Sequence, residues 1–253
     1  MCKKYGFGVF FLLICKIKKI IVIFYKKMKL SKILIVSATK LEVSKITNQL
    51  KAEKKINENL FQYKYKSLDI EVLITGVGAI FTVFELNNIL LKNKYDLVLN
   101  LGIAGSFNES LNIGDTVNVV SDEFGDIGIS DKSNFYTIFE KNFAEANKFP
   151  FSQGKLINKN NIFFNDLKKT KAITVCSTSG SAEQINQRKQ KFNADIETME
   201  GASFFYVCMK QDVYFQQIRA ISNYVKERKF AEWDIGKATS NLAKTIIEFL
   251  DKK

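Results

Sequence analysis

The chain of 253 residues contains no histidine. This absence excludes the Ser-His-Asp triad, the Cys-His dyad and every zinc site that uses imidazole ligands. Cysteine is scarce as well, since Cys2, Cys15, Cys176 and Cys208 form no Cys-x-x-Cys pair. We interpret these residues as buried, reduced thiols of a cytoplasmic protein. The only proline, Pro150, marks no domain boundary.

Long apolar runs and linker-like tracts are also missing. No uninterrupted apolar stretch is long enough for a transmembrane helix. No internal repeat, low-complexity tract or Gly/Ser/Pro-rich linker divides the sequence. Hydrophobic residues make up 46% of the chain and charged residues 25%, as in ordinary globular domains. This composition excludes a disordered chain, a collagen-like repeat and a small disulfide-stapled fold.

The formal charge of +12 at first suggests a nucleic-acid-binding protein. However, residues 1–27 hold seven lysines and no acidic residue, and removing these seven charges leaves +5. Lysines in the remainder are scattered and mixed with Glu and Asp, without a basic helix or a basic patch that contains stacking aromatics. We therefore expect no nucleic-acid partner.

Residues 1–27 form an unusual leader. Basic residues and a short apolar stretch resemble a signal peptide, but no small-residue cleavage site follows. Three lysines between positions 16 and 19 would place charge at the centre of a spanning helix. Met28 begins a segment typical of the first strand of a cytosolic α/β enzyme. Our hypothesis is that translation starts at Met28, with one domain over 28–253 and no stable membrane association; the alternative is a membrane-surface anchor.

Short apolar segments alternate with helical patterns after Met28, which predicts a mostly parallel sheet covered by helices on both faces. The expected strands are 33–36, 70–75, 97–101, 116–120, 173–176 and 214–221. The expected helices are 41–50, 79–91, 181–192, 200–209 and 235–250. Residues 125–168 are polar, aromatic and irregular, and they give no clear pattern.

Ligands of such folds bind beyond the carboxyl ends of the strands. The segments that follow the expected strands are 37–42, 75–78, 102–106, 177–180, 197–200 and 222–223. Gly76 and Gly78 resemble the start of a dinucleotide fingerprint, but Phe81 replaces the third glycine, which favours a tight turn. Gly102 and Gly105 permit close approach of a ligand to the backbone, although a plain turn explains them nearly as well.

Charged residues in these segments allow two interpretations each. Glu197 and Glu200 precede an apolar helix, where acids suit the helix dipole; one of them could equally bind sugar hydroxyls. Arg219 lies within an apolar strand and needs a partner, which Glu42 or Glu200 could supply. A structural ion pair and a catalytic role are about equally compatible with that position.

Five segments carry a resemblance, in order along the chain: ILIVSATKLEV (33–43), ITGVG (74–78), LVLNLGIAGSFNESLNIGDTVNVVSDEFGDIG (97–128), IETMEGASFFYVC (196–208) and QIRAISNYVKERKFAEWDI (217–235). Together they resemble the purine nucleoside phosphorylase/uridine phosphorylase superfamily. Within it they are similar to the methylthioadenosine/S-adenosylhomocysteine nucleosidases and, more closely, to the futalosine hydrolases. The resemblance implies a three-layer α/β/α fold with a central twisted mixed sheet, usually in a homo-oligomer. It also implies cleavage of an N-ribosidic bond without a metal or an organic cofactor.

The resemblance assigns roles to single positions. Glu42 corresponds to the carboxylate that activates water, and Glu200 to the acid that binds the ribose hydroxyls. Arg219 corresponds to a further residue of the catalytic site. The other substrate-binding positions implied are Met199, which packs against the sugar, Glu197, Ser222 on the supporting strand, and Ala104, Gly105 and Ser106 beside sugar and base.

Asn223 departs from the adenine-specific nucleosidases, which have an aspartate that helps to protonate the base. An asparagine amide can donate to O6 of a 6-oxopurine and accept from a protonated N7. Asn223 therefore favours hypoxanthine as the leaving base, as in hydrolysis of futalosine during menaquinone biosynthesis. The alternative is a methylthioadenosine/S-adenosylhomocysteine or aminodeoxyfutalosine nucleosidase that releases adenine.

Two further departures concern stacking and the nucleophile. Residues 177–180 carry no aromatic side chain, so we expect Phe107 or Phe124 to stack on the base. The chain has no arginine before Arg188, and the loops 75–79 and 102–106 carry no cation. Water is therefore a better nucleophile than phosphate.

A catalytically silent nucleoside-binding protein is a further alternative. It is disfavoured because both expected carboxylates, Glu42 and Glu200, are present.

Overall fold

The computed structural model describes residues 30–132, 134–160, 162–227 and 233–253. The chain divides into two compact units, Met1–Leu30 and Ser31–Lys253. All the elements described below belong to the second unit. The leader 1–27 and the hypothetical start at Met28 lie outside the described residues, as does Arg228.

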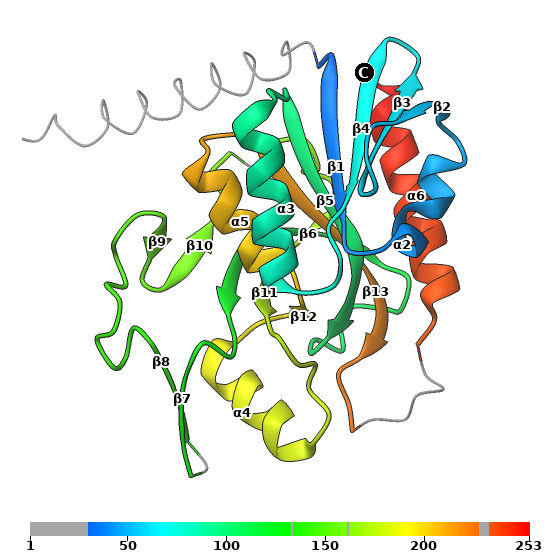
Figure 1. Ribbon diagram of the computed structural model, residues 1–253. Helices are drawn as coiled ribbons and strands as arrows, with labels where there is room; N and C mark the ends of the chain where they lie inside the picture. Colours follow the sequence, from blue (N-terminus) through cyan, green and yellow to red (C-terminus); the bar gives the residue numbers. More distant parts are fainter. Residues whose placement is uncertain (1–29, 133, 161, 228–232) are drawn as a thin grey trace, which may run out of the picture. The chain divides into compact units, whose positions relative to one another are not determined.

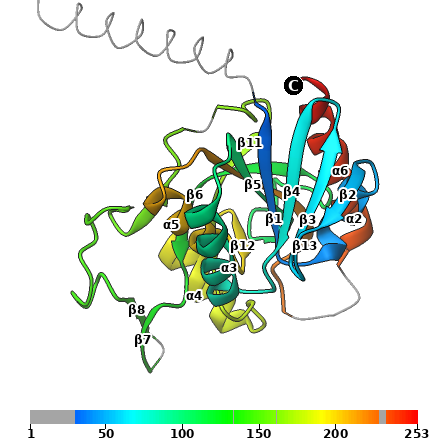
Figure 2. The ribbon, with the colours of Figure 1, turned by 45° about the horizontal axis from the view of Figure 1, so that its top comes forward.

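The second unit is a mixed β-sheet with helices on both faces (Figures 1 and 2). Its strands are β1 (Lys32–Ser37), β2 (Lys51–Lys55), β3 (Leu60–Tyr65), β4 (Leu68–Ile74), β5 (Leu97–Ser106), β6 (Thr116–Phe124), β7 (Gly128–Asp131), β8 (Asn134–Thr137), β9 (Phe151–Ser152), β10 (Lys155–Ile157), β11 (Lys168–Thr174), β12 (Ile196–Thr198) and β13 (Phe215–Tyr224). The helices are α2 (Lys40–Thr47), α3 (Ala79–Lys92), α4 (Ala182–Phe192), α5 (Gly201–Lys210) and α6 (Ile235–Asp251).

Strands β2, β3, β4, β1 and β5 lie in this order, with β1 parallel to both of its neighbours. Beyond them, five strands close on themselves. β5 pairs with β13, β13 with β6, β6 with β11, β11 with β12, and β12 returns to β5. The ring joins parallel and antiparallel pairs, so the prediction of a central mixed sheet is confirmed.

Helices cover the two faces in pairs. α3 packs against α5 on one face, and α2 packs against α6 on the other. Three aromatic rings hold α5 to the sheet: Phe204 and Phe205 contact Phe215 of β13 edge-on, with centroids 5.6 and 4.8 Å apart. These rings are at most 5% exposed, so they contribute both burial and ring-ring contacts. The packing fixes the start of α5 relative to β13, and both elements reach the candidate site.

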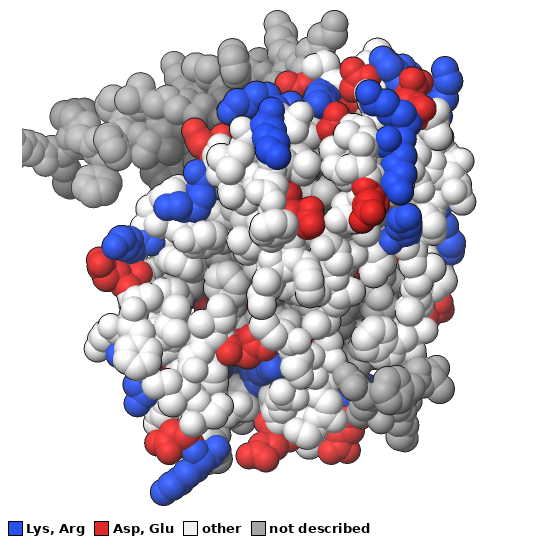
Figure 3. Space-filling view, viewed as in Figure 1, with Lys and Arg blue, Asp and Glu red and all other residues white. Residues whose placement is uncertain are grey.

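The described helices and surface can be compared with the expectations about membrane-spanning segments and about charge distribution. No helix among the described residues has the combined length and hydrophobicity that crossing a membrane requires. On the face shown in Figure 3, Lys and Arg side chains are interspersed with Asp and Glu, and the area over α3 is largely uncharged.

Several boundaries differ from the sequence-based expectation. β5 continues to Ser106, so residues 102–106 are strand rather than turn, because β13 and β12 supply hydrogen-bonding partners on either side. β13 continues to Tyr224. The hairpin β2–β3 was not expected, since β2 is fully exposed and has no apolar alternation. Between 125 and 168 the chain forms the short strands β7 to β10.

Candidate active site

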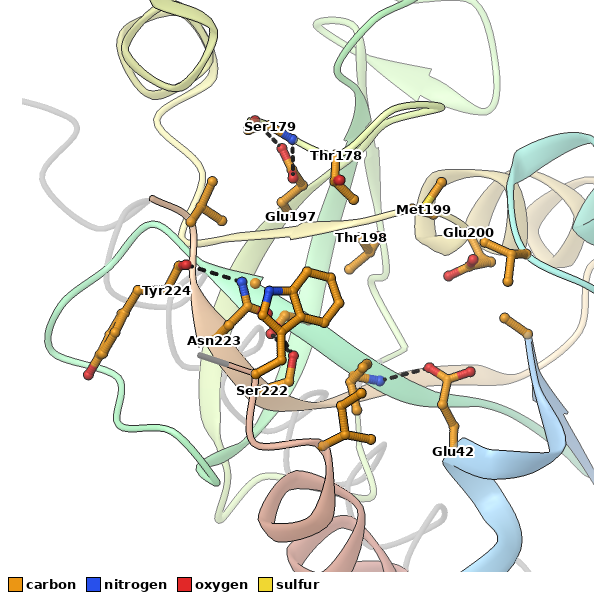
Figure 4. Close-up of a pocket in the computed structure, with 18 of the residues that line it drawn as sticks. Glu42, Thr178, Ser179, Glu197, Thr198, Met199, Glu200, Ser222, Asn223 and Tyr224 are labelled. Carbon is orange, nitrogen blue, oxygen red and sulfur yellow. Dashed lines mark hydrogen bonds between the residues drawn. The ribbon is translucent and has the colours of Figure 1, made fainter. Parts of the chain in front are cut away.

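A pocket of about 290 Å³ opens where β1, β5, β12 and β13 end (Figure 4). This volume is near the lower limit of typical small-molecule sites. Its walls come from the β1–α2 connection, the end of β5, the loop before α4, the β12–α5 junction and the end of β13. Elements far apart in sequence therefore converge on one concavity.

Most of the predicted site residues line this pocket. They are Glu42, Ala104, Gly105, Glu197, Met199, Glu200, Ser222 and Asn223. Arg219 and Ser106 do not line it. The Ser106 hydroxyl turns away to the backbone carbonyl of Asn108, at 2.9 Å, and the side chain is 1% exposed. Ser106 closes the end of β5 in this structure, and its expected role in binding substrate stays a prediction.

Glu42 is held at the first turn of α2. Its Oε2 atom accepts hydrogen bonds from the backbone N–H and the hydroxyl of Thr39, at 3.1 and 3.0 Å. This is a capping box, because the Thr39 hydroxyl also accepts from the Glu42 N–H. The Oε1 atom accepts from the backbone N–H of Ile103 at 3.0 Å. Glu42 thus starts a helix, links it to β5, and still faces the pocket.

Glu200 occupies the N-cap position of α5. Its Oε1 atom accepts from the Gly78 N–H at 3.0 Å, and Oε2 lies 3.6 Å from Nη2 of Arg219. Burial raises the pKa of the Glu200 carboxyl, whereas the Arg219 charge acts in the opposite direction. The prediction that Glu42 or Glu200 partners Arg219 is confirmed for Glu200.

Arg219 lies behind the pocket wall. Its side chain is 1% exposed, and Nη2 donates to Oδ1 of Asn100 at 3.1 Å. A guanidinium placed there supports Glu200 electrostatically but does not reach the cavity. This placement is that of a residue that positions Glu200, and the catalytic role expected from the resemblance stays a prediction.

Two glycines of β5 leave space for side chains of the site, and only Gly105 lines the pocket itself. A Cβ atom on Gly102 would lie 2.6 Å from Oε1 of Glu42 and would also collide with Nη1 of Arg219. A Cβ atom on Gly105 would lie 2.8 Å from Cγ2 of Val225 and 3.3 Å from Nδ2 of Asn223. Close approach, rather than a turn, is thus the reason for glycine at both positions.

A register shift in β13 brings two consecutive side chains into the pocket. Ile221 pairs with Ala104, but Asn223 pairs with the next residue, Gly105, so Ser222 is the extra residue of a bulge. In a regular strand, neighbouring side chains point to opposite faces. Here both Ser222 and Asn223 line the cavity.

Hydrogen bonds orient the Asn223 amide. Its Oδ1 atom accepts from the Ser222 hydroxyl at 2.8 Å, and Nδ2 donates to the carbonyl of Tyr224 at 3.1 Å. A primary amide has two N–H donors and a carbonyl with two lone pairs. One donor and one acceptor site therefore remain beyond these two bonds.

Glu197 lines the pocket, but both of its carboxylate oxygens are already engaged. Oε1 accepts from the Ser179 N–H at 2.8 Å, and Oε2 accepts from the Ser179 hydroxyl and from Nη1 of Arg188. In this structure Glu197 holds the neighbouring loop, and its expected role in binding substrate stays a prediction.

The aromatic residues of the pocket are not the expected ones. Phe107 is packed in a small core with Val225, and Phe124 packs on the main core. Trp233 and Tyr224 line the cavity instead, and Trp233 is 44% exposed. Trp233 is the only tryptophan of the chain and lies just before α6. Its place as a lone tryptophan just before an expected helix was the only feature of the sequence that could have indicated a role in the pocket.

Positive charge at the pocket is sparse. Lys226 is the one cationic residue among the described residues that line it. Its Nζ atom lies 5.1 Å from the ring centroid of Tyr224, and the residue is exposed. The Gly78 N–H, which could otherwise face an anion, is bonded to Glu200. The described pocket thus offers carboxylates, an amide and apolar walls.

Residues 32–251 match the family model of the phosphorylase superfamily. The chain belongs to this superfamily. Futalosine hydrolase of Thermus thermophilus is 25% identical over 181 residues, covering 70% of this chain and 80% of that protein. A 5′-methylthioadenosine/S-adenosylhomocysteine nucleosidase of Staphylococcus aureus is 30% identical over 165 residues, covering 61% and 69%. The Haemophilus ducreyi nucleosidase of that name is 27% identical over 176 residues, covering 65% and 71%.

The fold agrees with solved members of the superfamily. The native futalosine hydrolase of Helicobacter pylori superposes with a TM-score of 0.74 at 22% identity, covering 88% of this chain and 99% of that one. A 5′-methylthioadenosine/S-adenosylhomocysteine nucleosidase of Neisseria meningitidis superposes with a TM-score of 0.70 at 18% identity, covering 88% and 100%. The predicted nucleoside phosphorylase-like fold is therefore confirmed.

Proposed function

We propose that the chain is a nucleosidase that hydrolyses the N-ribosidic bond of futalosine and releases hypoxanthine. The observation that carries the proposal is the placement of Glu42, Glu200 and Asn223 around one pocket. Relatives named futalosine hydrolase and methylthioadenosine/S-adenosylhomocysteine nucleosidase support the reaction class.

Glu42 is the proposed general base that activates water. Its carboxylate lies at the pocket wall and is fixed by bonds to Thr39 and Ile103. A positioned base contributes about 10²- to 10⁴-fold to such reactions. Glu200 is the proposed acceptor for the ribose hydroxyls, with Arg219 3.6 Å from its Oε2 atom. Met199, next to Glu200 in the lining, is the proposed packing surface for the sugar.

Asn223 is the proposed residue that stabilises the leaving base. Loss of the base through an oxocarbenium-like transition state depends on stabilising the charge that develops on it. The unused donor and acceptor of the Asn223 amide match O6 and a protonated N7 of hypoxanthine.

Water rather than phosphate is the proposed nucleophile. Binding a phosphate dianion in a protein pocket calls for charge-assisted donors such as arginine. The described lining residues offer only the exposed Lys226. A carboxylate such as Glu42 would repel phosphate but would accept a proton from water.

The second candidate is an adenine-releasing nucleosidase, favoured by the relatives from H. ducreyi and S. aureus. Product analysis of the full chain discriminates the two. We would offer futalosine, aminodeoxyfutalosine, methylthioadenosine and inosine, each with and without phosphate, and identify the products by chromatography. Hypoxanthine from futalosine without phosphate supports the proposal. Adenine from methylthioadenosine supports the second candidate, and a strict need for phosphate contradicts hydrolysis.

We also propose a homo-oligomer that covers α3. Ile80, Phe81, Phe84 and Leu91 on this helix are between 59% and 78% exposed. Figure 3 shows few charged side chains over α3. An apolar row of this size on a helix is typical of a protein interface. Light scattering should show a multiple of the 28.9 kDa chain. The Phe84→Glu variant should have a lower molar mass in solution, and a monomeric wild type contradicts this part of the proposal.

The cytoplasmic location stays a prediction.

A further inference from the structure

A second buried arginine lies under the loop that forms one wall of the pocket. Arg188 is on α4, and its side chain is 6% exposed. A buried guanidinium is stable only with enough acceptors for its N–H groups. Arg188 was not among the site residues expected from the sequence, and it does not line the cavity.

The acceptors of Arg188 all belong to the pocket wall or to its support. Nη1 donates to the carbonyl of Ser177 at 2.9 Å, to the hydroxyl of Ser179 at 2.8 Å and to Oε2 of Glu197 at 3.0 Å. Nη2 lies 3.7 Å from Oδ2 of Asp126. One cation thus holds a backbone carbonyl, a hydroxyl and two carboxylates.

The same two carboxylates bind the loop directly. Glu197 accepts from both the N–H and the hydroxyl of Ser179, and Asp126 accepts from the N–H of Cys176 at 2.6 Å. Residues 176–179 are therefore held at both ends. The conformation of this loop depends on acids that Arg188 in turn orients.

The loop and Asn223 lie on opposite sides of Gly105, which lines the pocket. Gly105 pairs with Glu197 of β12 on one side and with Asn223 of β13 on the other. Two strand spacings separate these residues, or about 10 Å. Thr178 and Ser179 line the cavity on the Glu197 side, as Figure 4 shows. A planar base placed against Asn223 would have its opposite edge towards this loop.

We propose that Arg188 is a positioning residue for base recognition, which holds the loop 176–179 in place as the wall opposite Asn223. The inference rests on the proposed function, because it takes the ligand to be a purine nucleoside. A lysine would not replace Arg188, since an ammonium is a point charge and lacks the planar fork that reaches several acceptors.

Steady-state kinetics of Arg188→Lys and Arg188→Gln would test the inference, with futalosine and methylthioadenosine as substrates. Lys189→Gln is the matched control, because Lys189 is exposed on the same helix. We expect KM for the preferred substrate to rise about 10- to 100-fold in both Arg188 variants, with kcat changed much less. The ratio of kcat/KM for the two substrates should also move towards one. A uniform loss for both substrates would indicate a structural role only and overturn the inference.

Binding of the free bases separates this inference from the proposed function. Calorimetry would measure hypoxanthine and adenine binding to the wild type, Arg188→Lys and Lys189→Gln. Weaker binding of the preferred base to Arg188→Lys alone supports the inference. Equal binding by all three overturns it while leaving the nucleosidase intact. A wild type that neither binds a base nor cleaves a nucleoside refutes the proposed function. If Arg188→Gln does not fold, the charge-conserving Arg188→Lys variant still decides whether Arg188 positions the loop for base recognition.

Discussion

The carboxylate of Glu42 and the guanidinium of Arg219 converge on the space that a side chain at position 102 would fill. A Cβ atom there would lie 2.6 Å from Oε1 of Glu42 and closer still to Arg219. Gly102→Ala must therefore displace one of the two groups. We expect activity to fall about 100-fold, the order of effect that a misplacement of about 1 Å can have. Gly236→Ala is the control, because its nearest neighbour would be 3.7 Å away. Wild-type activity of Gly102→Ala would contradict this geometry.

Glu42→Gln separates chemistry from folding. Glutamine also satisfies the reciprocal bond of a capping box, so the contacts with Thr39 and the start of α2 should persist, although the amide nitrogen replaces Oε1 and the bond from the Ile103 N–H is lost. Loss of the general base should lower kcat about 10²- to 10⁴-fold. Nucleoside hydrolysis and thermal unfolding measured on the same samples check both statements. Unchanged turnover would reject Glu42 as the base.

Asn223→Asp should change the preferred base and introduce a pH dependence. The oxygen that replaces Nδ2 would face the carbonyl of Tyr224, to which the amide donates at 3.1 Å. Two facing oxygens favour the protonated acid, so the pKa of the new carboxyl should be raised. We expect the ratio of kcat/KM for methylthioadenosine over futalosine to rise, most strongly at acidic pH. An unchanged ratio would refute the role of Asn223 in base selection.

Asp122 should make the protein less stable as the pH rises. Its carboxyl is fully buried on β6, and burial raises its pKa to about 7. A group with a raised pKa in the folded state stabilises the fold at pH values below its unfolded pKa. That contribution is lost as the pH rises through the folded value. The free energy of unfolding should therefore decline between about pH 4 and pH 8, by at most about 4 kcal/mol from this group.

Asp122→Asn supplies the comparison for that decline. The amide oxygen can still accept from the Thr174 hydroxyl, as Oδ1 of Asp122 does at 2.9 Å. The new amide nitrogen would stand where Oδ2 now accepts from Nε2 of Gln217 at 3.2 Å, so the Gln217 amide must turn over to present Oε1, which has no partner within the described part of the chain. Denaturant unfolding at several pH values should give a flatter profile for Asp122→Asn than for the wild type. Parallel profiles would show that another group is responsible.

Local sequence predicted the parts of the fold that depend on local pattern. The buried run Lys32–Ser37 and the amphipathic helices are examples, and their boundaries were close. The hairpin β2–β3 was missed because Lys51–Lys55 is exposed on every residue. The continuation of β5 beyond Leu101 depends on its partners β12 and β13, which lie about 90 and 120 residues further along the chain.

The site was predicted only in part, because some of its contacts also depend on segments that are distant in sequence. Resemblance to a known family indicated Glu42, Glu200 and Asn223, and all three line one pocket. It did not indicate that Glu197 is committed to Arg188, because that pairing depends on how α4 packs beside β12. The bulge at Ser222 follows no local rule either, since it is a mismatch of lengths between two paired strands.

The bulge at Ser222 gives β13 one residue, Asn223, whose side chain takes no part in packing the hydrophobic core. Ile218, Ala220 and Ile221 of β13 are fully buried and committed to packing. The residue beyond the inserted Ser222 faces the cavity instead, so its chemistry can change without repacking the interior. If Asn223 selects the base as proposed, substitutions at position 223 can change substrate preference without repacking the core, whereas deletion of Ser222 would rotate that side chain out of the pocket.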